Sequence, residues 1–363
     1  MRHAIVLLVI LFGLQVVAQT GETSNLEATY FYGNIYRHKD DIGHLIKGHP
    51  SGVILAWNQR TYGDKEWQSA FNYPDYGFSF QYEDLANKYL GKTYAIGAHY
   101  NFYGFGRRLM FRISQGIAMT TNPYDKETNF KNNAFGSRFM SSNLFMLQYS
   151  RERVWRNFGF RAGIALTHFS NGRFKSPNSG INTFAASASV VYDLGAEREY
   201  VVADTISKDH SERIKYNIAV RTGISESPVA HSGQKPFYHI GLYADKRIGR
   251  KSALQLGADV FFSMYLKDYI EYMSVAFPEL PPVDPDTDYK RVAVIAGHEL
   301  FINRLSIETQ VGYYVYKPFD YEIDFYQRLG TKYYISDKWF AALSLKSHAA
   351  RAEAIELGIG IRL

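Results

Sequence analysis

The segment that decides the fold lies near the middle of the chain, where residues 158–170 read FGFRAGIALTHFS. Side chains of a β-strand alternate between its two faces. One face of this segment therefore carries aromatic and aliphatic residues and ends in His168 and Ser170, whereas the other face carries smaller and polar residues such as Gly159 and Arg161. This would be an unusual place for the nucleophile and base of a soluble enzyme, and a suitable one if the substrate is itself a lipid.

The same alternation recurs along most of the chain. From Leu26 onward no stretch keeps a helical period for three turns, and short alternating segments are separated by polar or Gly/Pro-containing breaks. The expected strands are 26–37, 52–60, 76–82, 93–103, 109–119, 143–153, 158–170, 182–194, 216–225, 237–247, 252–265, 291–302, 305–316, 322–335, 339–347 and 354–363. The sequence therefore predicts an all-β protein, a transmembrane antiparallel β-barrel with an even number of strands between twelve and sixteen.

Composition favours a membrane barrel over a soluble β-sandwich, which would alternate as well. Aromatic residues make up 16% of the chain, with 29 Tyr and 25 Phe, and such residues form girdles at both surfaces of outer-membrane barrels. The chain has no cysteine, which excludes disulfides and thiolate metal sites. The net charge of +6 is modest, and the aromatics alternate with aliphatics, so we expect no nucleic-acid partner.

The N-terminus has the features of a secretory signal. Residues 1–18 begin with Arg2 and His3, continue with an apolar run and end in the small residue Ala18. A membrane anchor is the alternative, but the run is shorter than the ~20 residues of a spanning helix. We therefore expect a signal peptide over 1–18, followed by one outer-membrane barrel domain over 19–363.

The connections between the expected strands alternate in length. Short breaks occur at 104–108, 155–157, 248–251, 303–304 and 336–338, and longer ones at 120–142, 171–181, 226–236 and 266–290. Because outer-membrane barrels have short periplasmic turns and longer external loops, the loop after Ser170 should face outward. Segment 197–213 is long and charged but falls on the short-turn side, so either the strand count slips there or the barrel has a periplasmic excursion.

The polar residues at the outer strand ends suggest ester chemistry. A serine nucleophile needs a base, a group that orients the base, and donors for the oxyanion. His168 and Ser170 lie side by side on one strand face, and Asn182 ends the apolar stripe of the next strand. If the hairpin register allows it, the three side chains meet on the lipid-facing wall.

Residues 168–172 (HFSNG) and 177–182 (PNSGIN) together resemble the motifs of outer-membrane lipid A 3-O-deacylases of PagL type. The resemblance implies a barrel with its active site on the lipid-facing wall at the outer leaflet. It assigns Ser170 as nucleophile, His168 as base and Asn178 as an oxyanion donor, with Asn171 and Gly180 in support.

Two features depart from this family. Asn182 stands where the family has a glutamate, and an asparagine can orient His168 but cannot stabilise imidazolium by charge. The chain is also about twice as long as the small eight-stranded members, so the resemblance leaves its second half unexplained and suggests an enlarged relative.

The expected function is removal of an ester-linked acyl chain from lipid A, or a related outer-leaflet lipid, in the outer membrane of a Gram-negative bacterium. Lipid A or lipopolysaccharide is the expected partner, and no cofactor or metal is expected. A channel for small solutes is the main alternative, and it would place the important polar residues in the lumen. An adhesive barrel that binds a partner through loop 266–290 is a third.

Overall fold

The structure is a computed structural model that describes residues 23–196, 198–201, 212–277, 282–349 and 351–363. The predicted signal peptide, residues 1–18, lies outside the described residues. No helix among the described residues is long and apolar enough to cross a membrane.

The described part of the chain contains sixteen strands, one at each predicted position. The first half holds β1 (Ser24–Ile35), β2 (Ser51–Gln59), β3 (Asp75–Asp84), β4 (Lys92–Gly104), β5 (Leu109–Thr120), β6 (Phe139–Trp155), β7 (Phe158–Ser170) and β8 (Ile181–Asp193). The second half holds β9 (Lys215–Ser225), β10 (Lys235–Arg247), β11 (Ser252–Ser263), β12 (Arg291–Ile302), β13 (Leu305–Tyr316), β14 (Phe325–Tyr334), β15 (Trp339–His348) and β16 (Arg351–Arg362). Short helices η1 (Asp40–Leu45), α2 (Glu66–Ala70) and α3 (Tyr265–Ala276) lie in the connections. The prediction of an antiparallel, all-β membrane barrel fold is confirmed.

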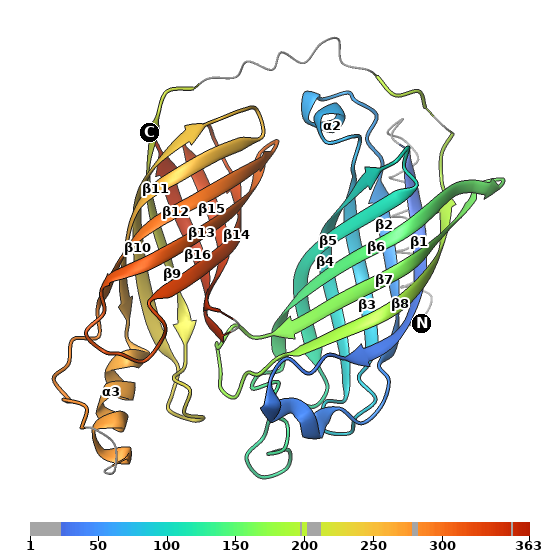
Figure 1. Ribbon diagram of the computed structural model, residues 1–363. Coiled ribbons are helices and arrows are strands. Elements are labelled where there is room, and N and C mark those ends of the chain that lie inside the picture. The colour runs from blue at the N-terminus through green and yellow to red at the C-terminus, as the bar shows by residue number, and fades with distance from the viewer. Residues whose placement is uncertain (1–22, 197, 202–211, 278–281, 350) are drawn as a thin grey trace, which may run out of the picture.

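The described strands close into two separate barrels, which stand side by side in Figure 1. In the first barrel β1 pairs with β8, so that Asn25 lies opposite Asp193. In the second, β16 pairs with β9, so that Arg362 lies opposite Asn217. This corrects the expectation of one barrel domain over 19–363. Alternation places the strands but does not say which strand the last one will pair with.

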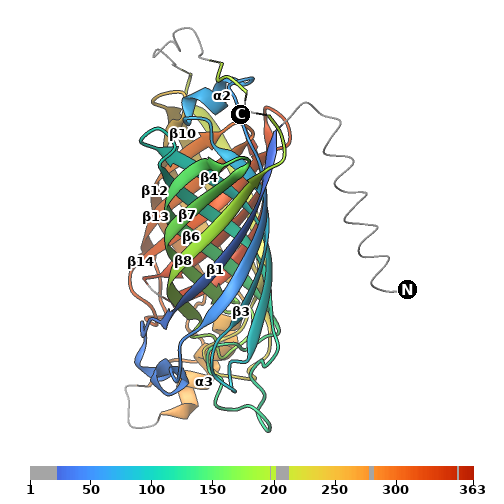
Figure 2. The same cartoon turned by 90° about the vertical axis from the view of Figure 1, so that its right-hand side faces the viewer.

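The strands on either side of segment 197–213 belong to different barrels, and most of the segment itself lies outside the described residues. β8 ends at Asp193 and β9 begins at Lys215, both at the upper end of Figure 1, where the short turns lie. Segment 197–213 is therefore not an excursion within one barrel. Most of the longer loops, and α3, lie at the opposite end, as Figure 2 shows from the side. The β2–β3 connection with α2 is an exception, because it lies at the short-turn end.

The outer and inner faces of the strands follow the predicted alternation. Apolar residues such as Ile164, Leu254 and Val311 are exposed on the outer wall. A barrel of eight strands is just wide enough for side chains to fill it, and both lumens hold paired charges. Glu27 binds Arg112 at 2.8 Å and Arg161 at 2.6 Å in the first barrel.

Charged side chains also cross the lumen of the second barrel. Arg328 binds Asp259 at 2.5 Å and Glu356 at 2.7 Å. These groups are almost fully buried, and buried charges need such partners. The alternative of a solute channel therefore finds no support in the lumens, as far as the described residues line them.

An apolar cluster closes the loop end of the first barrel. It includes Ile42 and Leu45 from η1, Phe135 from the β5–β6 loop, and Phe169 and Ile181 from the facing ends of β7 and β8. Phe169 points inward because its neighbours His168 and Ser170 occupy the other face of the strand. The cluster therefore holds the ends of β7 and β8, which carry the candidate site, from inside the barrel.

Candidate active site

His168 and Asn182 face each other across β7 and β8 on the outer wall of the first barrel. The register of the two strands places them directly opposite. His168 Nδ1 lies 2.6 Å from Asn182 Oδ1. Because an amide oxygen only accepts hydrogen bonds, Nδ1 carries the proton and Nε2 is left as the basic nitrogen.

Ser170 is the last residue of β7 and is 8% exposed under the loop that follows it. Asn178 Nδ2 donates to Ser170 Oγ at 2.9 Å, and the Gly172 N–H donates to it at 3.2 Å. The N–H of Asn171 donates to Asn178 Oδ1 at 2.9 Å. Since a backbone N–H can only donate, this contact fixes the amide with its Nδ2 toward the serine.

Gly180 lies between the serine and the histidine. A Cβ at this position would stand 3.4 Å from Ser170 Cβ and 3.5 Å from His168 Cε1, and its φ is +70°. Among the hydrogen bonds of the described residues, none joins Ser170 to His168. A proton transfer between them would require Ser170 Oγ to turn away from Asn178. Such contacts often tighten only when substrate is bound.

The predicted supporting residues have different contacts. The Gly180 N–H donates to Ala134 O at 3.1 Å, so it is not free to bind an oxyanion. Asn171 Nδ2 donates to Ser137 Oγ at 3.0 Å and to Lys175 O at 2.7 Å, which holds the loop together. Asn178 Nδ2 and the Gly172 N–H are the donors directed at Ser170.

His38 is a neighbour that the sequence analysis did not identify. Its Nε2 lies 3.0 Å from the carbonyl oxygen of Ser179, so the β1–β2 loop reaches the β7–β8 loop. No pattern in the sequence connects positions so far apart, and a histidine in a polar loop has no distinguishing neighbour.

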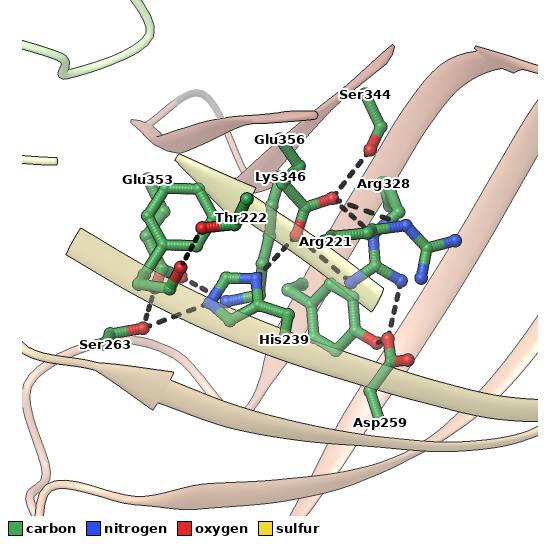
Figure 3. Close-up of polar contacts among 12 residues, drawn as sticks. Arg221, Thr222, His239, Asp259, Ser263, Arg328, Ser344, Lys346, Glu353 and Glu356 are labelled. Carbon is green, nitrogen blue, oxygen red and sulfur yellow. Dashed lines mark hydrogen bonds and ion pairs between the residues drawn. The ribbon is translucent and has the colours of Figure 1, made fainter. Parts of the chain in front are cut away.

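A second serine, histidine and carboxylate lie together in the lumen of the second barrel (Figure 3). His239 Nε2 lies 3.2 Å from Ser263 Oγ, and His239 Nδ1 lies 2.6 Å from Glu356 Oε1. The atoms thus have the mutual order of a hydrolytic triad. Ser263 is 1% exposed, however, and His239 and Glu356 are fully buried.

The surroundings of Ser263 explain this group as part of the lumen's ion-pair network. Arg291 Nη2 donates to Ser263 Oγ at 3.0 Å, and Ser263 donates to Glu353 Oε1 at 3.3 Å. Arg291 and Lys346 both bind Glu353. A lipid ester would have to enter a filled lumen to reach Ser263, whereas His168 and Asn182 lie on the wall that contacts lipid.

Glu322, His348 and Glu353, at the loop end of the same lumen, offer ligand atoms within 4.8 Å of one another. Arg291 binds Glu322 at 3.3 Å and also binds Glu353. Cationic side chains therefore already neutralise these carboxylates, as expected for buried charges.

Comparison with protein families identifies both halves of the chain. The model of lipid A 3-O-deacylase (PagL) matches residues 51–191, and the model of the acyloxyacyl hydrolase C-terminal domain matches residues 214–363. The chain belongs to the PagL-type family. It is accordingly a protein of the Gram-negative outer membrane. The two matches fall on separate barrels. The second barrel of this PagL-type chain is therefore a separate domain, which matches a different family model from the first.

Solved outer-membrane proteins are similar over most of their length but at low identity. Omp33 of Acinetobacter baumannii is 10% identical and covers 94% of this chain and 98% of its own, with a TM-score of 0.20. A triple mutant of the Rhodopseudomonas blastica porin is 8% identical and covers 94% and 99%, also with a TM-score of 0.20. No curated protein matches the chain significantly.

Proposed function

We propose that this outer-membrane ester hydrolase removes an acyl chain from lipid A with Ser170 as nucleophile, His168 as base and Asn182 as the residue that orients the base. Membership in a lipid A deacylase family supports a hydrolase that acts on an ester bond. The contact of 2.6 Å between His168 Nδ1 and Asn182 Oδ1 on the lipid-facing wall carries the assignment of residues.

In the first half of the reaction Ser170 Oγ attacks the ester carbonyl carbon while its proton passes to His168 Nε2. Asn182 holds the ring in the tautomer that leaves Nε2 free for this proton. When the tetrahedral intermediate collapses, His168 returns the proton to the sugar oxygen that leaves. The acyl group stays on Ser170, and water activated by His168 then releases it as a fatty acid.

The oxyanion would be held by donors that already contact Ser170. Asn178 Nδ2 at 2.9 Å and the Gly172 N–H at 3.2 Å are directed at the serine oxygen. When Ser170 turns toward His168, both donors become available to the carbonyl oxygen of the substrate. Donors of this kind contribute on the order of 10²-fold or more to acyl transfer.

Asn182 leaves the imidazolium without a full negative charge beside it. Enzymes with a Cys-His-Asn arrangement work with an amide in this place. We therefore expect a functional but slower hydrolase than one with a carboxylate at residue 182.

The experiment that tests the proposal is mass spectrometry of lipid A from cells that express the wild-type chain or Ser170→Ala. Folding of both proteins is checked by heat-modifiable migration in gels. Loss of one acyl chain with the wild type alone supports the proposal and identifies the ester that is cut. Identical lipid A from two folded proteins would refute it.

A further inference from the structure

The loop that follows the nucleophile lies against the second barrel. Gly172 is so close to β16 that a Cβ on it would stand 2.3 Å from Ile355 Cγ1. Two residues later, the carbonyl oxygen of Phe174 accepts a hydrogen bond of 2.9 Å from Gln234 Nε2, just before β10. The residues between Ser170 and Asn178 therefore run along the junction of the two barrels.

Glu226, in the β9–β10 loop of the second barrel, binds the backbone of this loop. Its Oε2 accepts the N–H of Ser176 at 2.6 Å, and its Oε1 accepts the N–H of Gly233 at 3.0 Å. Ser176 Oγ also donates to Ser227 O at 2.6 Å. Glu226, Ser176 and Ser227 are each 2% exposed, so these contacts are shielded from water, which strengthens them.

Arg173 inserts into the mouth of the second barrel. Its guanidinium lies 4.8 Å from the ring centre of Tyr265, at the start of α3, and 3.5 Å from a carboxylate oxygen of Glu322. Its own carbonyl oxygen accepts the N–H of Glu226 at 3.0 Å. Burial disfavours the charge of Arg173, but Tyr265 and Glu322 outweigh burial and hold its pKa above the ordinary value, so the cation stays in place.

We propose that the second barrel positions the catalytic loop of the first, and that Glu226 and Arg173 are its positioning residues. The inference rests on the function proposed for Ser170. By holding residues 172–176, the second barrel keeps the Gly172 N–H and the Asn178 amide at hydrogen-bond distance from Ser170. A loop that had to be ordered during each reaction would lose rate to conformational entropy.

The positioning role also explains why a second barrel accompanies an active site that lies wholly on the first. Ser170, His168, Asn178 and Asn182 all come from β7, β8 and their loop. The second barrel supplies none of these groups, but its β9–β10 loop and the mouth of its lumen hold the segment between them. Supporting contacts of this kind set how accurately catalytic groups are placed.

The test compares purified full-length wild type with Glu226→Ala, Glu226→Gln, Arg173→Ala and Arg173→Lys. The substrate is lipid A in detergent micelles, and kcat and KM are measured separately. We expect kcat to fall by about tenfold or more in the alanine variants with KM little changed, because the loop bears donors and not the substrate contacts of the outer wall. Arg173→Lys should recover part of the loss, since a lysine keeps the charge beside Glu322.

Lys251→Ala is the matched control. Lys251 joins the barrels at their other end, where its Nζ donates to Ala70 O and lies 4.5 Å from the ring centre of Phe71. Its loss removes a contact between the barrels without touching residues 171–180, so kcat should stay at the wild-type value. A fall equal to that of Glu226→Ala would mean that any loosening of the junction slows the enzyme, which would overturn the specific role of Glu226.

Hydrogen–deuterium exchange gives a readout that is independent of activity. Glu226→Ala and Arg173→Ala should speed exchange in peptides that cover residues 171–180 and leave the core of β7 protected. Wild-type exchange in that loop, or wild-type kcat in both folded alanine variants, would overturn the inference. A wild-type chain without Ser170-dependent turnover would refute the proposed function instead, and the exchange data would still decide whether the loop is held.

Discussion

The two barrels place the same residue types on opposite faces of their walls. In the first barrel His168 points outward, with its Nδ1 bound to Asn182 at 2.6 Å. In the second barrel His239 points inward, with its Nδ1 bound to Glu356 at 2.6 Å and its Nε2 3.2 Å from Ser263. By distances alone, the inner group is the more complete triad.

If Ser170 is the nucleophile, as we propose, the face of the wall on which a group lies, and not only its internal distances, decides which group can act on a membrane lipid. Ser263 is surrounded by Arg291 and Glu353, which use the same hydroxyl that a substrate would need. Ser170 lies at a strand end beside the outer wall, where its partners are an amide and a backbone N–H. The inner histidine links Ser263 and Glu356 within a filled lumen, whereas the outer one lies with Asn182 on the wall that meets lipid.

The largest expected effect comes from replacing Ser170 by alanine, and the same replacement of Ser263 is its counterpart in the second barrel. Ser170→Ala should lower kcat for lipid A deacylation by about 10³-fold or more, because the acyl group then has no nucleophile. Ser263→Ala should keep wild-type turnover if folded. Kinetics of the purified proteins on lipid A micelles measure both, and activity that depended on Ser263 would reverse the assignment.

Breaking the lumen network of the second barrel should cost stability. Arg328→Met leaves the buried carboxylates of Asp259 and Glu356 without a major partner, so the free energy of unfolding should fall by about 3–5 kcal/mol. Unfolding in urea, followed by gel mobility, measures the change. Arg351→Met removes an exposed arginine of the same barrel and serves as control, with a change expected within about 0.5 kcal/mol.

Asn182 tests how the outer histidine is held. Asn182→Ala removes the acceptor of the Nδ1 proton and should lower kcat on the order of 10²-fold, because the ring loses its tautomer and orientation. Asn182→Asp should retain at least wild-type turnover, since a carboxylate also stabilises the imidazolium. If the aspartate variant were as slow as the alanine variant, the orienting role would have to be abandoned.

Gly180→Ala should give the smallest of these effects. The residue has φ +70°, and a Cβ would stand 3.0 Å from Phe169 O, so an alanine should cost about 1 kcal/mol of local strain and slow turnover several-fold. Gly106→Ala is the control, because Gly106 has φ +62° in an open turn at the other end of the barrel. Equal turnover in the two variants would show that the space beside Ser170 does not matter.

The sequence was sufficient to place the strands and their faces. Alternation from Phe158 to Ser170 predicted the bounds of β7 and the outward direction of His168, because a strand has only two faces and one of them meets lipid. The directly opposed positions of His168 and Asn182 followed from the hairpin once its register was set.

Pairing between distant strands was not predictable in the same way. Nothing in the alternation indicates that Asn25 should lie opposite Asp193 and not opposite a residue of the last strand. The contacts of Arg173 and Ser176 with the second barrel depend on that closure, so they could not be inferred either. The long charged segment at 197–213 was the one local sign, because it stood where a short turn belonged.

The closure of β1 on β8 also bears on how the protein is built. Every strand of the first barrel finds both hydrogen-bonding neighbours within residues 24–193, so no edge of that sheet has to wait for the second half of the chain. The first and last strands of each barrel are separated by about half as many residues as those of one sixteen-stranded ring would be. The shorter separation along the chain lowers the entropic cost of each closure. Assembly in the membrane can then proceed as two successive closures. The second closure brings Glu226, and the end of the second lumen that contacts Arg173, to a first barrel that is already closed.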